Sequence, residues 1–132
     1  MKILTRILKI ILFLAYAGTV IWLCFGTFET SADIPREIMG IPIDKCIHFA
    51  MFLPFPILSF LSYNGFSRKF GKALAVIALA FLAGAILAAG TELGQGLTSY
   101  RSADSHDFLA DLIGLGVGAL CLIITKSVRK QE

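Results

Sequence analysis

The chain is poor in charged residues and lacks the short motifs that mark many soluble enzymes. Only 16% of its 132 residues are charged, whereas 57% are hydrophobic. A soluble domain of this size rarely has that balance, because too little polar surface remains to cover its core. It has no basic patch interleaved with aromatic residues, which argues against a nucleic-acid partner. A Gly-rich phosphate loop, an HExxH pattern and a nucleophile motif are absent too.

Cysteine is also scarce, and its three copies do not have a metal-binding spacing. Cys24, Cys46 and Cys121 form neither a CxxC motif nor a Cys/His arrangement typical of zinc sites. We interpret them as small apolar residues within helices. A disulfide between Cys24 and Cys46 stays an alternative, since both are expected near the same membrane surface.

Long apolar runs dominate the chain instead. Several reach 18 residues or more, which is the length that crosses the hydrocarbon core of a bilayer as a helix. They predict an all-α membrane bundle of four transmembrane helices in a single domain covering residues 1–132. The expected helices span residues 7–28, 45–63, 73–97 and 107–125.

The first apolar run needs to be distinguished from a secretory signal peptide. Ala15-Tyr16-Ala17 resembles a small-x-small cleavage site. The run continues well past this site, through Trp22 and Phe25, and is too long for a signal peptide. We therefore interpret it as a transmembrane helix.

Prolines and small residues indicate how the helices bend and pack. Pro54 and Pro56 each remove a backbone donor from the second helix and should bend it. Membrane helices tolerate such bends where neighbours cover the freed carbonyls. Small residues at four-residue spacing predict close helix approach in lipid. They are Ala80, Gly84 and Ala88 in the third helix and Gly114 and Gly118 in the fourth.

The distribution of basic residues predicts the orientation. Nine of the twelve Lys and Arg residues lie in the two terminal segments and the middle loop, whereas Arg36, Lys45 and Arg101 lie in the other two connections. The nine are Lys2, Arg6, Lys9, Arg68, Lys69, Lys72, Lys126, Arg129 and Lys130. The positive-inside rule then places both termini in the cytoplasm and residues 29–44 and 98–106 outside.

Polar residues gather at the predicted outer ends of three helices. A carboxylate in hydrocarbon is costly unless it is paired or hydrated, so Glu92 and Asp111 should face the bundle interior or a wet pocket. Asp44 and His48 share one helix face, as do Glu92 and Gln95. The predicted binding pocket consists of Asp44, Lys45, His48, Glu92, Gln95, Arg101, Asp107 and Asp111.

Several of these residues also have purely structural interpretations. Asp44 is a candidate N-cap of the second helix, and Asp104 or Asp107 of the fourth. His106 is expected to be a solvated residue at the interface. Arg101 can pair with Glu92 or Asp107 without any further role. Caps alone do not explain why polar side chains also lie a turn deeper, so we favour a functional pocket.

The residue types in this pocket suit more than one chemistry. His48 and Glu92 are the candidates for general acid–base catalysis. Asp107 and Asp111 are candidate ligands of a divalent cation, the one cofactor that the set suggests. Arg101 suits bidentate contact with a phosphate or carboxylate. Whether the protein is an enzyme stays open on this pattern.

At these residues the chain resembles the VanZ-like family of small bacterial membrane proteins. Asp44-Lys45 precedes His48 and Phe49, Glu92 precedes Gln95, and Arg101-Ser102 precedes Asp107, Gly114 and Gly118. The resemblance covers residues 40–120. Asp111 departs from it, because the family pattern usually has Asn at this place. An amide-specific role therefore does not carry over to this chain.

The resemblance implies a role at the bacterial cell envelope, in the cytoplasmic membrane. The family is named after a protein associated with resistance to the glycopeptide teicoplanin. The first hypothesis is that the pocket binds an envelope component, such as a lipid-linked precursor or an anionic headgroup, with Arg101 and Lys45 contacting phosphate or carboxylate. The alternative is an intramembrane hydrolase or transferase acting on an envelope lipid. A transporter is less favoured, because the cytoplasmic helix halves lack polar groups.

Overall fold

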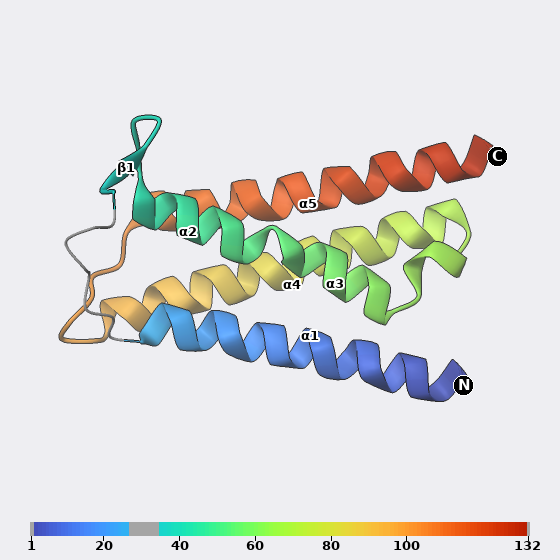
Figure 1. Ribbon diagram of the computed structural model, residues 1–132, viewed down its shortest axis with the longest axis horizontal. Coiled ribbons are helices and arrows are strands. Elements are labelled where there is room, and N and C mark those ends of the chain that lie inside the picture. Colours follow the sequence, from blue (N-terminus) through green and yellow to red (C-terminus); the bar gives the residue numbers. More distant parts are fainter. Residues whose placement is uncertain (1, 27–34, 132) are drawn as a thin grey trace.

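The computed structural model describes residues 2–26 and 35–131 of the chain. The helices run roughly side by side as an elongated bundle (Figure 1). In order, the elements are α1 (Lys2–Phe25), β1 (Glu37–Ile38), β2 (Ile41–Pro42), α2 (Ile43–Phe52), α3 (Pro54–Ser62), the 3-10 helix η1 (Gly65–Ser67), α4 (Phe70–Gly96) and α5 (Ser105–Gln131). Four segments of the described chain are long enough and apolar enough to span a membrane. They are α1, the α2–α3 pair, α4 and α5.

Several helices extend beyond the ranges expected from the apolar runs. Helix α1 begins at Lys2 rather than at residue 7, and α4 begins at Phe70 rather than at residue 73. Helix α5 covers Ser105–Gln131 rather than residues 107–125. An apolar run measures the thickness of the hydrocarbon, whereas Lys, Arg and Gln are good helix formers that continue a helix into the polar layer. Residues 27 and 28, the expected end of the first helix, lie outside the described residues.

The second span is divided in two at the prolines. Helix α2 ends at Phe52 and α3 begins at Pro54, with Leu53 between them in helical conformation. The Leu53 N–H still donates to the Phe49 carbonyl. Pro54 and Pro56 have no N–H to continue the pattern, so the expected bend becomes a joint between two helices.

A short β-hairpin precedes α2 and was not expected from the sequence. Strand β1 pairs antiparallel with β2, with Ile38 opposite Ile41. Met39 and Gly40 in the turn have positive φ angles of 53° and 79°. Two consecutive positive φ values are typical of a type I′ turn, whose twist suits a two-residue hairpin. The all-α prediction therefore needs this one addition.

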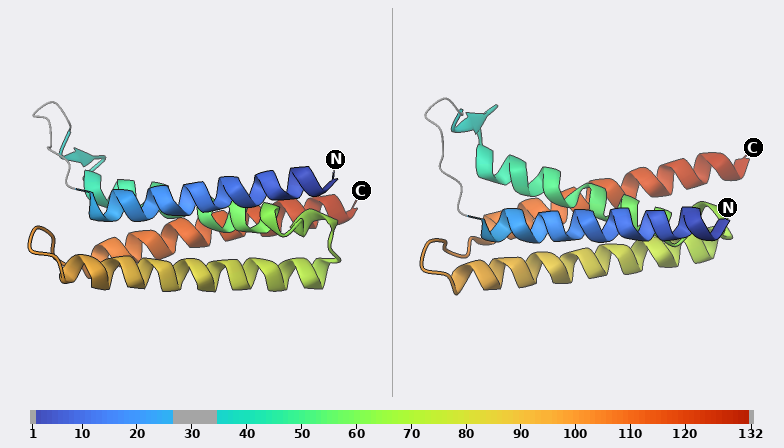
Figure 2. Two further views of the ribbon diagram at one scale, coloured as in Figure 1. Left: turned by 90° about the horizontal axis from the view of Figure 1, so that it is seen from below. Right: turned by 60° about the horizontal axis from the view of Figure 1, so that its bottom comes forward.

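Helix α5 packs closely against α2 and α4, and small residues allow this approach (Figure 2). A Cβ atom added at Gly114 would overlap the Phe49 carbonyl oxygen, and one at Gly118 would overlap the Leu53 carbonyl oxygen. On α4, Gly84 lies against the Leu115 side chain. Gly114 and Gly118 thus let the α5 backbone lie directly on the backbone of the second span, whereas Gly84 makes room for a side chain.

The two ends of the bundle differ in what they carry. Both chain termini lie at one end together with η1, and we call this the terminal end (Figure 1). The other end carries the hairpin, the first turns of α2 and α5 and the last turns of α1 and α4; we call it the polar end. Cys24, Cys46 and Cys121 are all free thiols, so Cys24 and Cys46 are not bonded to each other.

Candidate functional site

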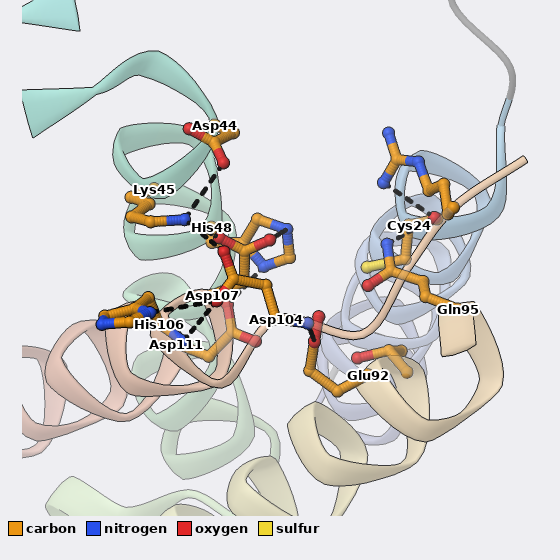
Figure 3. Close-up of polar contacts among 12 residues, drawn as sticks. Cys24, Asp44, Lys45, His48, Glu92, Gln95, Asp104, His106, Asp107 and Asp111 are labelled. Atoms are coloured by element: carbon orange, nitrogen blue, oxygen red, sulfur yellow. Dashed lines mark hydrogen bonds and ion pairs between the residues drawn. The ribbon is translucent and has the colours of Figure 1, made fainter.

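Lys45 joins two helices at the polar end through three carboxylates. Its Nζ atom lies 2.6 Å from Asp107 Oδ1, 2.8 Å from Asp104 Oδ2 and 3.1 Å from Asp44 Oδ2 (Figure 3). Lys45 and Asp44 are in the first turn of α2, whereas Asp107 is in the first turn of α5. An ammonium group has three donors, and here each has an acceptor. Lys45 is therefore fully engaged within the protein.

His48 lies one turn deeper and pairs with Asp111. His48 Nδ1 is 2.9 Å from Asp111 Oδ1, and both residues are buried, Asp111 completely. The other ring nitrogen, Nε2, is 3.7 Å from Asp107 Oδ2. Close packing of α2 on α5 positions the pair, since both residues lie on the facing sides of these helices. A buried carboxylate thus orients the imidazole toward Asp107.

Asp104 connects this group to α4. Its backbone N–H donates to Glu92 Oε2 at 2.8 Å, and its own Oδ1 accepts the His106 N–H at 2.9 Å. Asp104 is therefore the N-cap of α5. The Lys45 ammonium, with a smaller effect from the His106 N–H, holds the pKa of Asp104 well below its usual range. These residues form what we call the polar cluster: Asp44, Lys45, His48, Glu92, Asp104, Asp107 and Asp111.

Two further predicted site residues serve the end of α1 instead. Gln95 Nε2 donates to the Cys24 carbonyl at 2.7 Å, and the Arg101 guanidinium donates to the same oxygen at 3.0 Å. Tyr100 Oη donates to the Phe25 carbonyl at 3.0 Å. The last carbonyls of a helix have no partner within it, so these donors satisfy the C-terminus of α1. In Figure 3, Gln95 and Cys24 lie to one side of Glu92, opposite His48 and Asp107.

The buried part of the polar cluster has unused acceptor capacity. Glu92 Oε1 and Asp111 Oδ2 are buried and have no hydrogen-bond partner among the described residues. Buried polar atoms are almost always paired, because an unpaired one costs about 1–3 kcal/mol. The cluster therefore suits a bound group that donates hydrogen bonds or carries positive charge.

The structure corrects three interpretations of single residues. Asp44 is not the N-cap of α2, because the helix begins at Ile43 and Pro42 occupies the cap position. Arg101 bonds to the Cys24 carbonyl, and no ion pair joins it to Glu92 or Asp107 within the described residues. Lys45 is used by carboxylates, so it does not offer free donors to a phosphate. The physical reason is that the rotation of each helix about its axis decides which side chains meet. The spacing of apolar residues does not define that rotation to within one residue.

Other expectations agree with the structure, and one member of the polar cluster was missed as a site residue. His106 is largely exposed and bonds only locally to Asp104. Asp104 was expected as a cap but left out of the pocket, although its spacing to Asp107 and Asp111 marks it as part of the same helix face. Of the two candidate metal ligands, Asp107 forms a group with Glu92 and His48 in which each residue offers one ligand atom within 4.8 Å of the others, whereas Asp111 belongs to no such group among the described residues.

A family model described as VanZ/LLP1 matches residues 4–126 of the chain. The matched range includes every residue of the polar cluster, and it agrees with the resemblance inferred from the motifs. No curated protein and no solved structure matches the chain.

Proposed function

The chain belongs to the VanZ/LLP1 family, and from that premise we propose that it binds a phosphate-bearing envelope lipid or lipid-linked precursor at its polar end. The protein is a multi-pass membrane protein with four candidate spans in the described part of the chain. In our proposal it resides in the bacterial cytoplasmic membrane with the polar end outside. Occupation of the polar end would alter envelope properties, including access of glycopeptides such as teicoplanin.

The arrangement of basic residues supports this orientation. Both termini and the η1 loop share the terminal end, so the basic residues of three separate segments gather there. Cytoplasmic membrane surfaces attract such clusters. A thiol reagent that does not cross membranes should label a cysteine introduced at Met39 in intact cells but not one introduced at Lys69. The reverse labelling pattern would overturn the orientation.

The observation that carries the binding proposal is a buried, unpartnered pair of carboxylate oxygens at the end of the bundle that also carries an exposed Arg101. One guanidinium nitrogen of Arg101 holds the α1 C-terminus, and the exposed remainder can contact a phosphate. Glu92 Oε1 and Asp111 Oδ2 can accept hydrogen bonds from headgroup hydroxyls or an amine. The polar end thus offers a cation for a phosphate and acceptor oxygens for hydrogen-bond donors. A phospholipid headgroup carries both kinds of group.

The test is binding of fluorescent phosphatidylglycerol to the full-length protein in detergent, with phosphatidylcholine as the comparison lipid. Arg101→Ala should weaken phosphatidylglycerol binding by about 10- to 100-fold, the value of a charge-assisted contact of roughly 1.5–3 kcal/mol. Arg36→Ala is the matched control, because it removes an exposed arginine just before the hairpin at the same end. Arg101→Lys keeps the charge and a donor for α1 but loses the planar fork. Binding that survives Arg101→Ala would contradict the proposal.

A second candidate function is hydrolysis or group transfer on an envelope lipid. The buried His48–Asp111 pair favours it, because a carboxylate that orients an imidazole is a recurrent general-base arrangement. The measurement is inorganic phosphate release from a polyprenyl pyrophosphate probe by the purified protein. Release that His48→Gln abolishes while phosphatidylglycerol binding persists supports an enzyme. Release no faster than in a protein-free sample removes this candidate.

A further inference from the structure

Three side chains of the polar cluster share an arrangement: an outer partner, meaning a group outside these three side chains, holds one polar atom of each, and the second polar atom makes no hydrogen bond among the described residues. His48 Nδ1 is held by Asp111 Oδ1, and Asp107 Oδ1 is held by Lys45. Glu92 Oε2 is held by the Asp104 backbone N–H. The atoms that remain are His48 Nε2, Glu92 Oε1 and Asp107 Oδ2.

Among these three atoms, the buried Glu92 oxygen lacks the partner that burial demands. Glu92 is only 6% exposed, and its Oε1 atom has no hydrogen-bond partner among the described residues. His48 Nε2 and Asp107 Oδ2 are 3.7 Å apart, which is too long for a hydrogen bond. One ligand atom from each of the three residues lies within 4.8 Å of the others. The three thus converge on one small volume without satisfying one another.

We propose that His48 Nε2, Glu92 Oε1 and Asp107 Oδ2 bind a divalent transition-metal ion. In protein metal sites a ligating histidine donates its other ring N–H to a carboxylate, and ligating carboxylates are themselves hydrogen-bonded. Asp111, the Asp104 N–H and Lys45 are the corresponding outer partners here. The pattern therefore matches a supported ligand set rather than an accidental group of acids.

The local charge balance also favours a cation. Five carboxylates of the polar cluster face one lysine and one histidine. Asp111 is completely buried and Glu92 nearly so. An uncompensated carboxylate out of water is costly, and buried charges are usually paired or coordinate metals. A divalent ion between Glu92 and Asp107 would offset the excess negative charge where it is least hydrated.

The ligand types select among metals. Magnesium and calcium prefer all-oxygen sites, whereas imidazole combined with carboxylates suits Zn²⁺ or Mn²⁺. Ligand atoms bound at roughly 2.0–2.2 Å in tetrahedral geometry lie about 3.3–3.6 Å apart, so side-chain rotations that draw the three atoms together would close the site. Three protein ligands leave a coordination position open for an exogenous oxygen. The metal proposal rests on the proposed function in this respect, since a headgroup phosphate oxygen would occupy that position. With the metal bound, Glu92 Oε1 is a metal ligand, and Asp111 Oδ2 remains as the acceptor for a headgroup donor.

The experiment uses the full-length protein in detergent, stripped with EDTA, and titrates it with Mn²⁺ while electron paramagnetic resonance reports the free ion. We expect one bound Mn²⁺ per chain, displaced by Zn²⁺ but not by equimolar Mg²⁺. Glu92→Gln should weaken binding by more than about 100-fold, and the outer-partner variant Asp111→Asn by about 10- to 100-fold. Glu37→Gln, which neutralises an exposed acid on the hairpin, is the matched control and should bind like the wild type.

Two additional readouts keep the result interpretable. Circular dichroism shows whether each variant keeps its helices, and nitrogen hyperfine coupling to bound Mn²⁺, lost in His48→Gln, identifies the imidazole ligand. Absence of stoichiometric Mn²⁺ or Zn²⁺ binding by the wild type overturns the metal site, as does unchanged binding by a folded Glu92→Gln. Phosphatidylglycerol binding measured with and without EDTA separates the two proposals. If no metal binds and EDTA does not change lipid binding, the proposed function is supported and the metal site is rejected. If the metal binds and the lipid does not, the metal site is supported and the proposed function is rejected.

Discussion

The two ends of the bundle handle charge in opposite ways. At the terminal end two cations of α5 have local partners: Lys126 donates to the Phe66 carbonyl at 2.7 Å, and Arg129 lies 4.8 Å from the Phe66 ring centroid. At the polar end, carboxylates lie within the helix interface, and two of their oxygens have no partner among the described residues. The apolar groove of about 490 Å³ between α1, α3 and α4 is lined by residues such as Phe13 and Ala80 and by none of the polar cluster.

The basic residues of the terminal end are accounted for by solubility and by orientation in the membrane. The carboxylates buried at the polar end require another explanation. Basic residues at a membrane surface are hydrated and tolerate replacement. Carboxylates within the bundle lower stability unless something compensates them. In our proposal, a bound group compensates His48, Glu92 and Asp111 in the interior. Variants at the two ends, compared in pairs, test this distinction.

The largest effect on stability is expected where one member of the buried pair is removed. Asp111→Ala leaves His48 buried without its partner and should lower the free energy of unfolding by about 3–5 kcal/mol. Arg129→Ala removes only a cation–π contact at the terminal end and should lower it by about 1 kcal/mol or less. Denaturant titration of the detergent-solubilised protein measures both. Equal losses of stability in the two variants would show that the buried pair matters no more to folding than the cation–π contact at the terminal end.

Two hydrogen-bonded lysines, one at each end of the bundle, provide the next contrast. Lys45→Met removes two charge-assisted hydrogen bonds that join α2 to the start of α5 and one to Asp44 within α2, and it should cost about 1.5–3 kcal/mol. Lys126→Met removes one bond to a carbonyl and should cost about 0.5–1.5 kcal/mol. The same unfolding assay applies. A Lys126→Met variant less stable than Lys45→Met would show that the carboxylate network adds nothing.

Glycine contacts give a smaller difference. Gly114→Ala forces α5 away from the Phe49 carbonyl near the polar end and should cost about 1–3 kcal/mol. Gly71→Ala meets open space near the terminal end and should be neutral or stabilising by up to about 1 kcal/mol, because Ala is the better helix former. Thermal melting followed by circular dichroism distinguishes the two. Gly114→Ala melting at the wild-type temperature would mean that α2 and α5 can separate freely.

The smallest expected effect is a pH dependence at the surface of the polar end. The folded-state pKa of Asp104 lies below its unfolded value of about 4, chiefly because Lys45 stabilises the carboxylate. The contribution of the Asp104 carboxylate to the free energy of unfolding is therefore fully present above a pH of about 4, and it is lost as the pH falls further. Stability of the wild type should decline in this acid range, and Lys45→Met should flatten the decline. Parallel acid profiles for the two proteins would show that the pair contributes nothing.

The sequence predicts the spans and the meeting of three helix ends, but not the partners of individual residues. Apolar runs report bilayer thickness, and the grouping of basic residues predicts which connections share a surface. Helix rotation and the exact end of α1 decide that Arg101 and Gln95 reach the Cys24 carbonyl. A difference of one residue in register rotates a side chain by about 100° around the helix. Hence no one-dimensional pattern predicts that Lys45 is enclosed by carboxylates.

The most direct test of whether the buried polar pair serves binding is its replacement by apolar residues in the double variant His48→Leu/Asp111→Val. Replacing a buried ion pair by apolar residues is often neutral or stabilising, whereas breaking it is not. We predict a melting temperature at or above that of the wild type, together with loss of Mn²⁺ and weakened phosphatidylglycerol binding. A folded double variant that melts several degrees lower but retains both ligands would contradict this account, because the pair would then be part of the scaffold and not of a binding site.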